Sequence, residues 1–74
     1  MNKIRVAEYC GELFVIVGYG CNQDGEEIFE LVPLRYLPNL AQARLVPWTI
    51  SLQASLVVEV DDKDLLRMLR ILYG

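Results

Sequence analysis

Apolar and polar positions divide the first half of the chain into three predicted strands. Residues 3–9 alternate, the two-residue period of a strand. Residues 13–17 are apolar without a break, which predicts a central strand over 13–19 with both faces covered. Residues 26–34 alternate again, and Pro33, which lacks a backbone N–H, predicts that this strand ends there or lies at an edge. Cys10-Gly11-Glu12 and Asp24-Gly25 separate the three strands and predict tight turns.

The second half predicts two more strands and a helix. Residues 45–52 alternate, and residues 56–60 form a short β-branched run. Over residues 62–73 the apolar side chains follow a helical period, and Asp61 or Asp62 is suited to cap the helix N-terminus. The predicted buried stripe of this helix consists of Leu65, Leu66, Leu69, Leu72 and Tyr73.

This order of elements predicts one small domain, residues 1–74, that is mostly β with a C-terminal α-helix. Five short strands cannot leave a flat sheet half covered, so we expect a small curled five-stranded sheet. An SH3-like barrel is the expected form, with the helix covering an open end or packing on a face. Such barrels host many unrelated activities, so the fold alone predicts no function.

The amino-acid composition excludes several kinds of catalytic and metal-binding site. The chain is 54% apolar and 23% charged, which is typical of a folded domain and not of a disordered one. It has no histidine and only two cysteines, so a catalytic triad, a His-ligated zinc site and a four-cysteine zinc site are excluded within one chain. We therefore expect no catalytic residues, no metal and no cofactor, hence a protein that is not an enzyme.

The net charge and the hydropathy of the chain indicate which partners it is unsuited to bind and where in the cell we expect it. The net charge of −3 argues against strong binding to nucleic acid or to an anionic membrane surface. No segment approaches the roughly 20 apolar residues that span a bilayer. We expect a cytoplasmic protein with reduced thiols. Cys10 and Cys21 would lie roughly 36 Å apart along one extended strand, too far for a disulfide.

Two acidic clusters have simpler structural explanations than a metal site. The residues around Asp24-Gly25 fail the spacing of a calcium loop and are typical of a solvated hairpin tip. The acids of Glu59–Asp64 stand at a helix start, where backbone N–H groups and the helix dipole favour them.

The stretch from Leu31 to Val58 contains no Asp or Glu, although it holds all three prolines and the only tryptophan. Depletion of charge together with Trp and Arg is typical of interface cores. Two interpretations of Trp48 stay open: it fills the core, or it lies at an interface. The predicted partner-binding residues are Arg35, Tyr36, Leu37, Leu40, Arg44 and Trp48.

The sequence therefore favours a non-enzymatic protein-binding or assembly module that acts through an apolar, acid-free surface around residues 34–48. A homodimer would cover that surface. On this hypothesis Tyr36→Ala or Leu40→Asp weakens association and leaves the fold intact.

Two alternatives remain. In one, Arg5, Arg35 and Arg44 converge with aromatic side chains in a small barrel that binds single-stranded nucleic acid. In the other, the acidic patches at 24–30 and 59–64 meet a basic partner, and the protein is an inhibitor or regulator of a larger enzyme.

Overall fold

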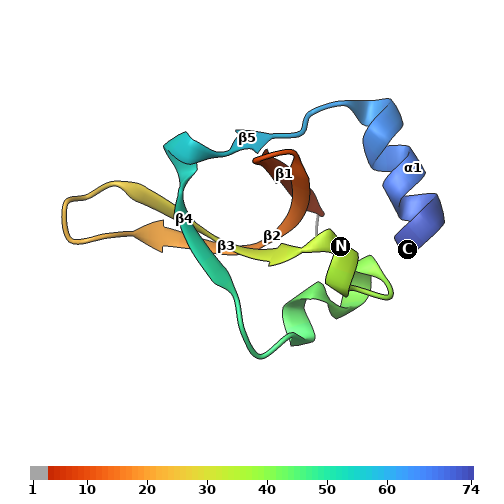
Figure 1. Cartoon of the computed structure of the whole chain (residues 1–74), viewed down its shortest axis with the longest axis horizontal. Coiled ribbons are helices and arrows are strands. Elements are labelled where there is room, and N and C mark those ends of the chain that lie inside the picture. Colours follow the sequence, from red (N-terminus) through yellow and green to blue (C-terminus); the bar gives the residue numbers. More distant parts are fainter. Residues whose placement is uncertain (1–3) are drawn as a thin grey trace.

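The computed structural model describes residues 4–74, and within them the chain forms one antiparallel sheet of five strands followed by a helix (Figure 1). The strand order in the sheet is β4-β3-β2-β1-β5. The strands are β1 (Arg5–Tyr9), β2 (Glu12–Cys21), β3 (Glu27–Pro33), β4 (Ile50–Gln53) and β5 (Val58–Glu59). The 3-10 segments are η1 (Leu34–Tyr36), η2 (Leu40–Leu45) and η3 (Ala54–Leu56), and the helix is α1 (Lys63–Tyr73). The prediction of a mostly β fold with five strands and a C-terminal helix is confirmed, whereas the sheet is open at β4 and β5.

Both predicted turns between the first three strands are present. Cys10 and Gly11 alone connect β1 to β2, and both have positive φ, +52° and +77°. This is the conformation that a two-residue hairpin needs to match the twist of its strands. At the next hairpin Gly25 has a φ of +80°, and its N–H donates to the carbonyl of Asn22 at 3.1 Å.

The sheet is curled, and β2 carries the irregularity that helps to bend it (Figure 1). The register of β2 against β3 shifts between Ile16 and Gly18, so one residue of β2 is extra. An extra residue of this kind bends a strand and increases its twist. The last strand returns to the start of the chain, where β5 pairs with β1 at Ala7 and Glu8.

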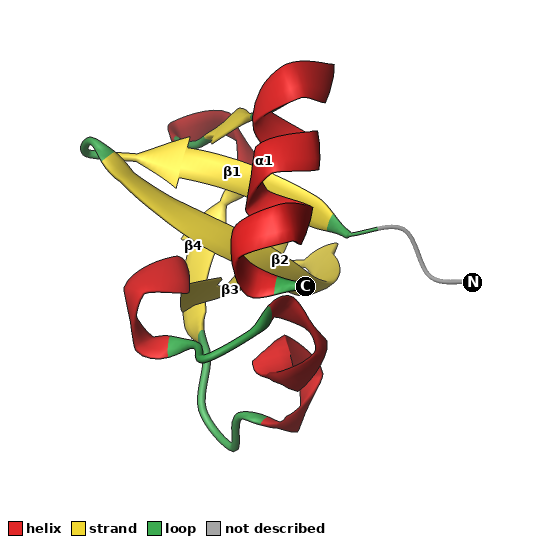
Figure 2. Ribbon diagram, turned by 90° about the vertical axis from the view of Figure 1, so that its right-hand side faces the viewer, coloured by secondary structure: helices red, strands yellow, loops and turns green. Residues whose placement is uncertain are grey.

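Alternate residues of the strands enter two hydrophobic clusters, one on each face of the sheet. Val6, Val15 and Val32 belong to the first cluster, which η1, η2 and α1 cover. Their neighbours Ala7, Phe14 and Leu31 belong to the second, which Val57 completes. Figure 2 shows α1 lying in front of the sheet, with η1 and η2 beside its C-terminal end. The helix thus packs on a face of the sheet, one of the two expected positions.

Several predicted boundaries need correction. The fourth strand begins at Ile50 and not at residue 45, because η2 extends to Leu45 and Pro47 cannot donate to a strand ladder. The fifth strand is confined to Val58–Glu59, although Val60 N–H still donates to the carbonyl of Val6 at 2.8 Å. Lys3, the predicted start of the first strand, lies outside the described residues.

The helix follows its predicted pattern with one exception. Asp62 is the cap, because its side chain accepts hydrogen bonds from the backbone N–H groups of Asp64 and Leu65 at 3.0 and 3.2 Å. Leu69 is buried, and Leu65, Leu66 and Tyr73 pack at the edge of the first cluster. Leu72 was expected in the buried stripe but is 65% exposed, since the sheet covers only part of the helix's wide apolar face.

Candidate protein-binding surface

A three-residue period sorts the acid-free segment into inner and outer side chains. Every third residue from 34 to 46 packs into the first cluster: Leu34, Leu37, Leu40 and Ala43 are buried there, and Val46 is partly buried. This spacing matches the 3.0 residues per turn of a 3-10 helix, the conformation that η1 and η2 adopt. The residues between these positions therefore point outward.

This period corrects two predicted site residues. Leu37 and Leu40 are only 5% and 4% exposed, so they belong to the core and not to a partner-binding surface. Arg35, Tyr36, Arg44 and Trp48 are exposed. Of these, the structure brings Arg35, Tyr36 and Trp48 together, whereas Arg44 lies on η2 beside a hollow that Ile4 and Leu40 also line.

We call Arg35, Tyr36 and Trp48 the aromatic surface. The rings of Tyr36 and Trp48 meet edge to face, with centroids 6.1 Å apart and planes at 70°. The Arg35 guanidinium lies 4.7 Å from the centroid of the Tyr36 ring, within the range of a cation–π contact. Tyr36 is 59% exposed and Trp48 46% exposed, so both rings remain available from solvent although they contact each other.

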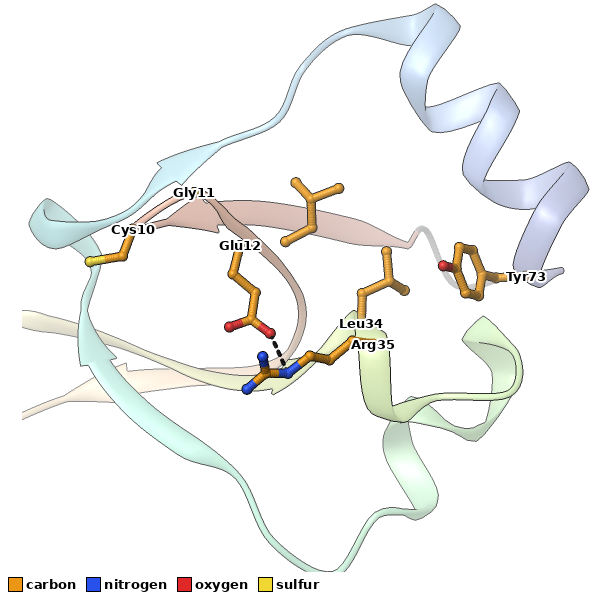
Figure 3. Close-up of a pocket in the computed structure, with 7 residues that line it drawn as sticks. Cys10, Gly11, Glu12, Leu34, Arg35 and Tyr73 are labelled. Carbon is orange, nitrogen blue, oxygen red and sulfur yellow. Dashed lines mark ion pairs between the residues drawn. The ribbon is translucent and has the colours of Figure 1, made fainter.

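Two carboxylates hold the segments that carry these side chains. Arg35 Nε lies 2.8 Å from Glu12 Oε2, an ion pair that ties η1 to the start of β2 (Figure 3). Glu12 Oε2 is itself buried and accepts no hydrogen bond of good geometry, so its contact with Arg35 is electrostatic. The residues that follow Trp48 in the chain are held by Glu30 of β3, whose carboxylate accepts hydrogen bonds from the hydroxyls of Thr49 and Ser51.

The two hydroxyl donors also change the acidity of Glu30. The hydrogen bond from Thr49 and then that from Ser51 stabilise the charged carboxylate, and together they hold the pKa of Glu30 below its ordinary value. Glu30 therefore fixes the chain directly after Trp48 as an ionised group at neutral pH. The sequence does not predict that Glu12 and Glu30 support the aromatic surface, because the residues they contact are far away along the chain.

An open hollow of about 550 Å³ adjoins the aromatic surface, and Arg35 belongs to both. The hairpin turn at Cys10 and Gly11 forms one wall, and Tyr73 of α1 lies at the opposite side (Figure 3). Leu13 and Leu34 add apolar lining. A partner that covers the two rings can therefore extend into this hollow past Arg35.

The other groups considered from the sequence form no comparable site in the described part of the chain. Cys10 and Cys21 are both exposed free thiols. No group of three or more His, Cys, Asp or Glu side chains among residues 4–74 is placed to hold a metal ion. In the same residues no helix has the length and apolar character needed to cross a membrane. At the helix start Asp62 is the cap and Asp64 is an acidic residue of the first turn, as expected of this cluster.

Comparison with protein-family models, with curated proteins and with solved structures finds no match for this chain.

Proposed function

We propose that this protein is a small non-enzymatic assembly module that binds a protein partner through the aromatic surface, and that a second copy of the chain is that partner. The observation that carries the proposal is the exposed pair of Tyr36 and Trp48, backed by Arg35. Trp, Tyr and Arg dominate binding energy at protein interfaces. A two-fold contact would place the same surface on both copies and cover four rings at once.

Preorganisation supports the same proposal. The ion pair to Glu12 and the hydrogen bonds of Thr49 and Ser51 to Glu30 restrain the aromatic surface before a partner arrives. Side chains that are already ordered lose less conformational entropy on binding. From the residues predicted by the sequence the proposal keeps Arg35, Tyr36 and Trp48. It leaves out Leu37 and Leu40, which are buried, and Arg44, which is not part of this contact.

The experiment uses Trp48 as its own reporter, because it is the only tryptophan in the chain. Sedimentation equilibrium and Trp48 emission are measured over a range of protein concentrations. We expect a dimer whose formation shifts the emission to shorter wavelength as the ring leaves water. Tyr36→Ala should weaken the association at least about tenfold, because it removes one of the two rings that form the edge-to-face pair.

Tyr19→Ala is the matched control, since Tyr19 is a tyrosine that is 71% exposed and lies outside the aromatic surface. It should dimerise like the unmodified protein. A monomer at all concentrations with unchanged Trp48 emission would overturn self-association. A photo-crosslinking residue placed at position 36, compared with one at position 19, then tests for a different partner in the native host. Equal crosslinking at both positions would overturn the aromatic surface as a binding site.

The proposed fold type is an open form of the SH3-like small barrel. The first four strands form a meander, and β5 returns to pair with β1, so β4 and β5 are the two edges that closure would bring together. The nucleic-acid alternative has less support, because Arg5 forms an ion pair with Glu59 and Arg35 with Glu12. An electrophoretic shift of a labelled oligonucleotide at low salt is its test.

A further inference from the structure

Three hollows follow one another from α1 to η2 and share lining residues. The first has a volume of about 260 Å³ and is lined by Lys63, Leu66, Arg67 and Arg70. The second shares Leu66 and Arg70 with the first and adds Ile4 and Leu40. The third shares Ile4 and Leu40 with the second and includes Arg44, which also lines a separate hollow with Arg5 and Tyr19. Neighbouring hollows share lining residues and therefore adjoin one another, although the second has a volume of only about 40 Å³; we call the surface that the three make up the basic groove.

Four cations stand along the basic groove without a carboxylate. Lys63, Arg67 and Arg70 lie at i, i+4 and i+7 of α1 and so share one face of the helix. Arg44 stands at the other end of the groove. The other two cations in residues 4–74 are paired, Arg5 with Glu59 and Arg35 with Glu12, whereas these four have no ion pair within the described part of the chain.

The acidic residues are placed elsewhere. No Asp or Glu lines any of the three hollows. Asp62 is turned to the helix N-terminus, where it accepts hydrogen bonds from backbone N–H groups. Asp64 is three residues before Arg67 on α1 and so is its neighbour on the helix surface, but the two form no ion pair in the described part of the chain. In a chain of net charge −3, four unpaired cations around one groove produce a local positive potential that favours an anionic ligand.

The floor of the groove decides which anionic ligand fits. It is aliphatic: Ile4 and Leu66 are half-buried, and Leu40 lies buried beneath them. Single-stranded nucleic acid binds where aromatic rings stack on its bases, and none of the three hollows is lined by an aromatic residue. An aliphatic floor between cations instead complements a peptide whose aliphatic side chains are flanked by carboxylates.

We propose that the basic groove binds an acidic peptide segment with aliphatic side chains, supplied by a partner protein. The carboxylates pair with Arg44, Arg70 and the other cations of α1, and the aliphatic side chains cover Ile4 and Leu66. This site is separate from the aromatic surface, since the two share no residue, and it stands whether or not the protein dimerises.

Fluorescence anisotropy with three labelled probes of equal charge tests the ligand class: a peptide of leucines and glutamates, a polyglutamate peptide, and oligothymidylate. We expect the leucine–glutamate peptide to bind at least about tenfold more tightly than polyglutamate, because burying even one leucine contributes that much. Equal binding of the two peptides would overturn the aliphatic floor as part of the site. Tighter binding of oligothymidylate would make the groove a nucleic-acid site, and absence of binding by all three probes would overturn the proposal.

Variants locate the site. Arg44→Gln and Arg70→Gln should each weaken binding of the leucine–glutamate peptide several-fold, and both side chains are exposed, so the fold should persist by circular dichroism. Gln23→Glu is the control, because it lowers the net charge by the same amount at the exposed tip of the β2–β3 hairpin. It should bind as the unmodified protein does. A loss with Gln23→Glu equal to that with Arg70→Gln would mean that net charge and not the groove attracts the peptide, which contradicts the proposal.

Discussion

Gly25 shows how strongly one backbone position constrains the residue that occupies it. Its φ of +80° lies in the region that L side chains rarely adopt. A Cβ at this position would meet nothing within 4 Å, so only the backbone conformation requires glycine there. Cys10 has a φ of +52° with a side chain present, which shows that the short β1–β2 turn imposes the same conformation on a less suited residue.

Gly25→Ala is expected to lower the free energy of unfolding by about 1–2 kcal/mol, because alanine is strained at positive φ. Urea denaturation measures the change. Gly20→Ala is the matched control: a Cβ there also meets nothing within 4 Å, and Gly20 does not have a φ in the positive region. An equal loss of unfolding free energy in both variants would mean that the positive φ of Gly25 is not the cause of the destabilisation.

Glu30 makes stability depend on pH in a defined direction. Its pKa in the folded protein is below the ordinary value of 4.5, so the folded state releases this proton more readily than the unfolded state. The contribution of Glu30 is therefore present above pH 4.5 and is lost as the pH falls through the folded pKa. We expect Ser51→Ala to raise the pKa of Glu30 towards 4.5 in a carboxyl NMR titration.

The control for Ser51→Ala is Ser55→Ala, which removes the hydroxyl of an exposed serine in η3. The pKa of Glu30 should stay low in that variant. A Glu30 carboxyl that titrates at or above 4.5 in the unmodified protein would contradict the hydrogen-bonded arrangement.

At the scale of elements, α1 is stabilised both by its cap and by its packing. An isolated helix of this length is marginal in water, so its contact with the sheet through Leu69 is essential. Its apolar face is wider than the sheet can cover, and Met68, Ile71 and Leu72 remain at least half exposed. The helical period in the sequence identifies the element, whereas the extent of the sheet determines which of its apolar residues are buried.

Asp62→Ala is expected to destabilise the protein by about 1 kcal/mol, because two backbone N–H groups at the start of α1 lose their acceptor. For a domain of this size the melting temperature should fall by about 4–8 °C. Asp61→Ala removes an equal charge one residue earlier, where no hydrogen bond to the helix is formed in the described structure, and it should change the melting temperature little. Equal falls in the two variants would show that the charge and not the capping hydrogen bonds stabilises the helix start.

At the scale of the whole molecule, the segment from 34 to 46 joins the two halves of the fold. Its period of three carries Leu34, Leu37 and Leu40 into the cluster that also holds Leu69 of α1. Distant parts of the chain thus meet in one core. For this reason we now expect Leu40→Asp to disrupt the fold and not to spare it, since a charge at a 4%-exposed position would be buried without a partner.

Leu40→Ala should lower the free energy of unfolding by about 2–5 kcal/mol, the usual cost of a cavity at a buried leucine. Leu45→Ala is the control within the same 3-10 segment, because Leu45 is 78% exposed, and its effect should stay within about 0.5 kcal/mol. Chemical denaturation of both variants makes the comparison. Similar losses of unfolding free energy in the two variants would contradict the assignment of Leu40 to the core and of Leu45 to the surface.

Prediction from the sequence succeeded where the pattern is local. The strand of residues 13–19, the turn at Gly25 and the helix after Asp62 all follow from neighbouring residues. The candidate site was predicted less completely. The acid-free composition of the segment predicts Leu37 and Leu40 at the surface together with Arg35, Tyr36 and Trp48. The three-residue period from Leu34 to Val46 is what separates the two buried leucines from these exposed side chains.

By itself the sequence determined the order of five strands and a C-terminal helix, the positions of the two hairpin turns and the absence of acids between Leu31 and Val58. These properties depend on side-chain periodicity and backbone preference over a few residues. Only the tertiary structure decided that Trp48 meets Tyr36, that Glu12 holds Arg35, and that Arg70 of α1 lines one hollow with Ile4 and Leu40. Such contacts join residues far apart along the chain, and they exist only once the sheet has curled and the helix has packed on its face.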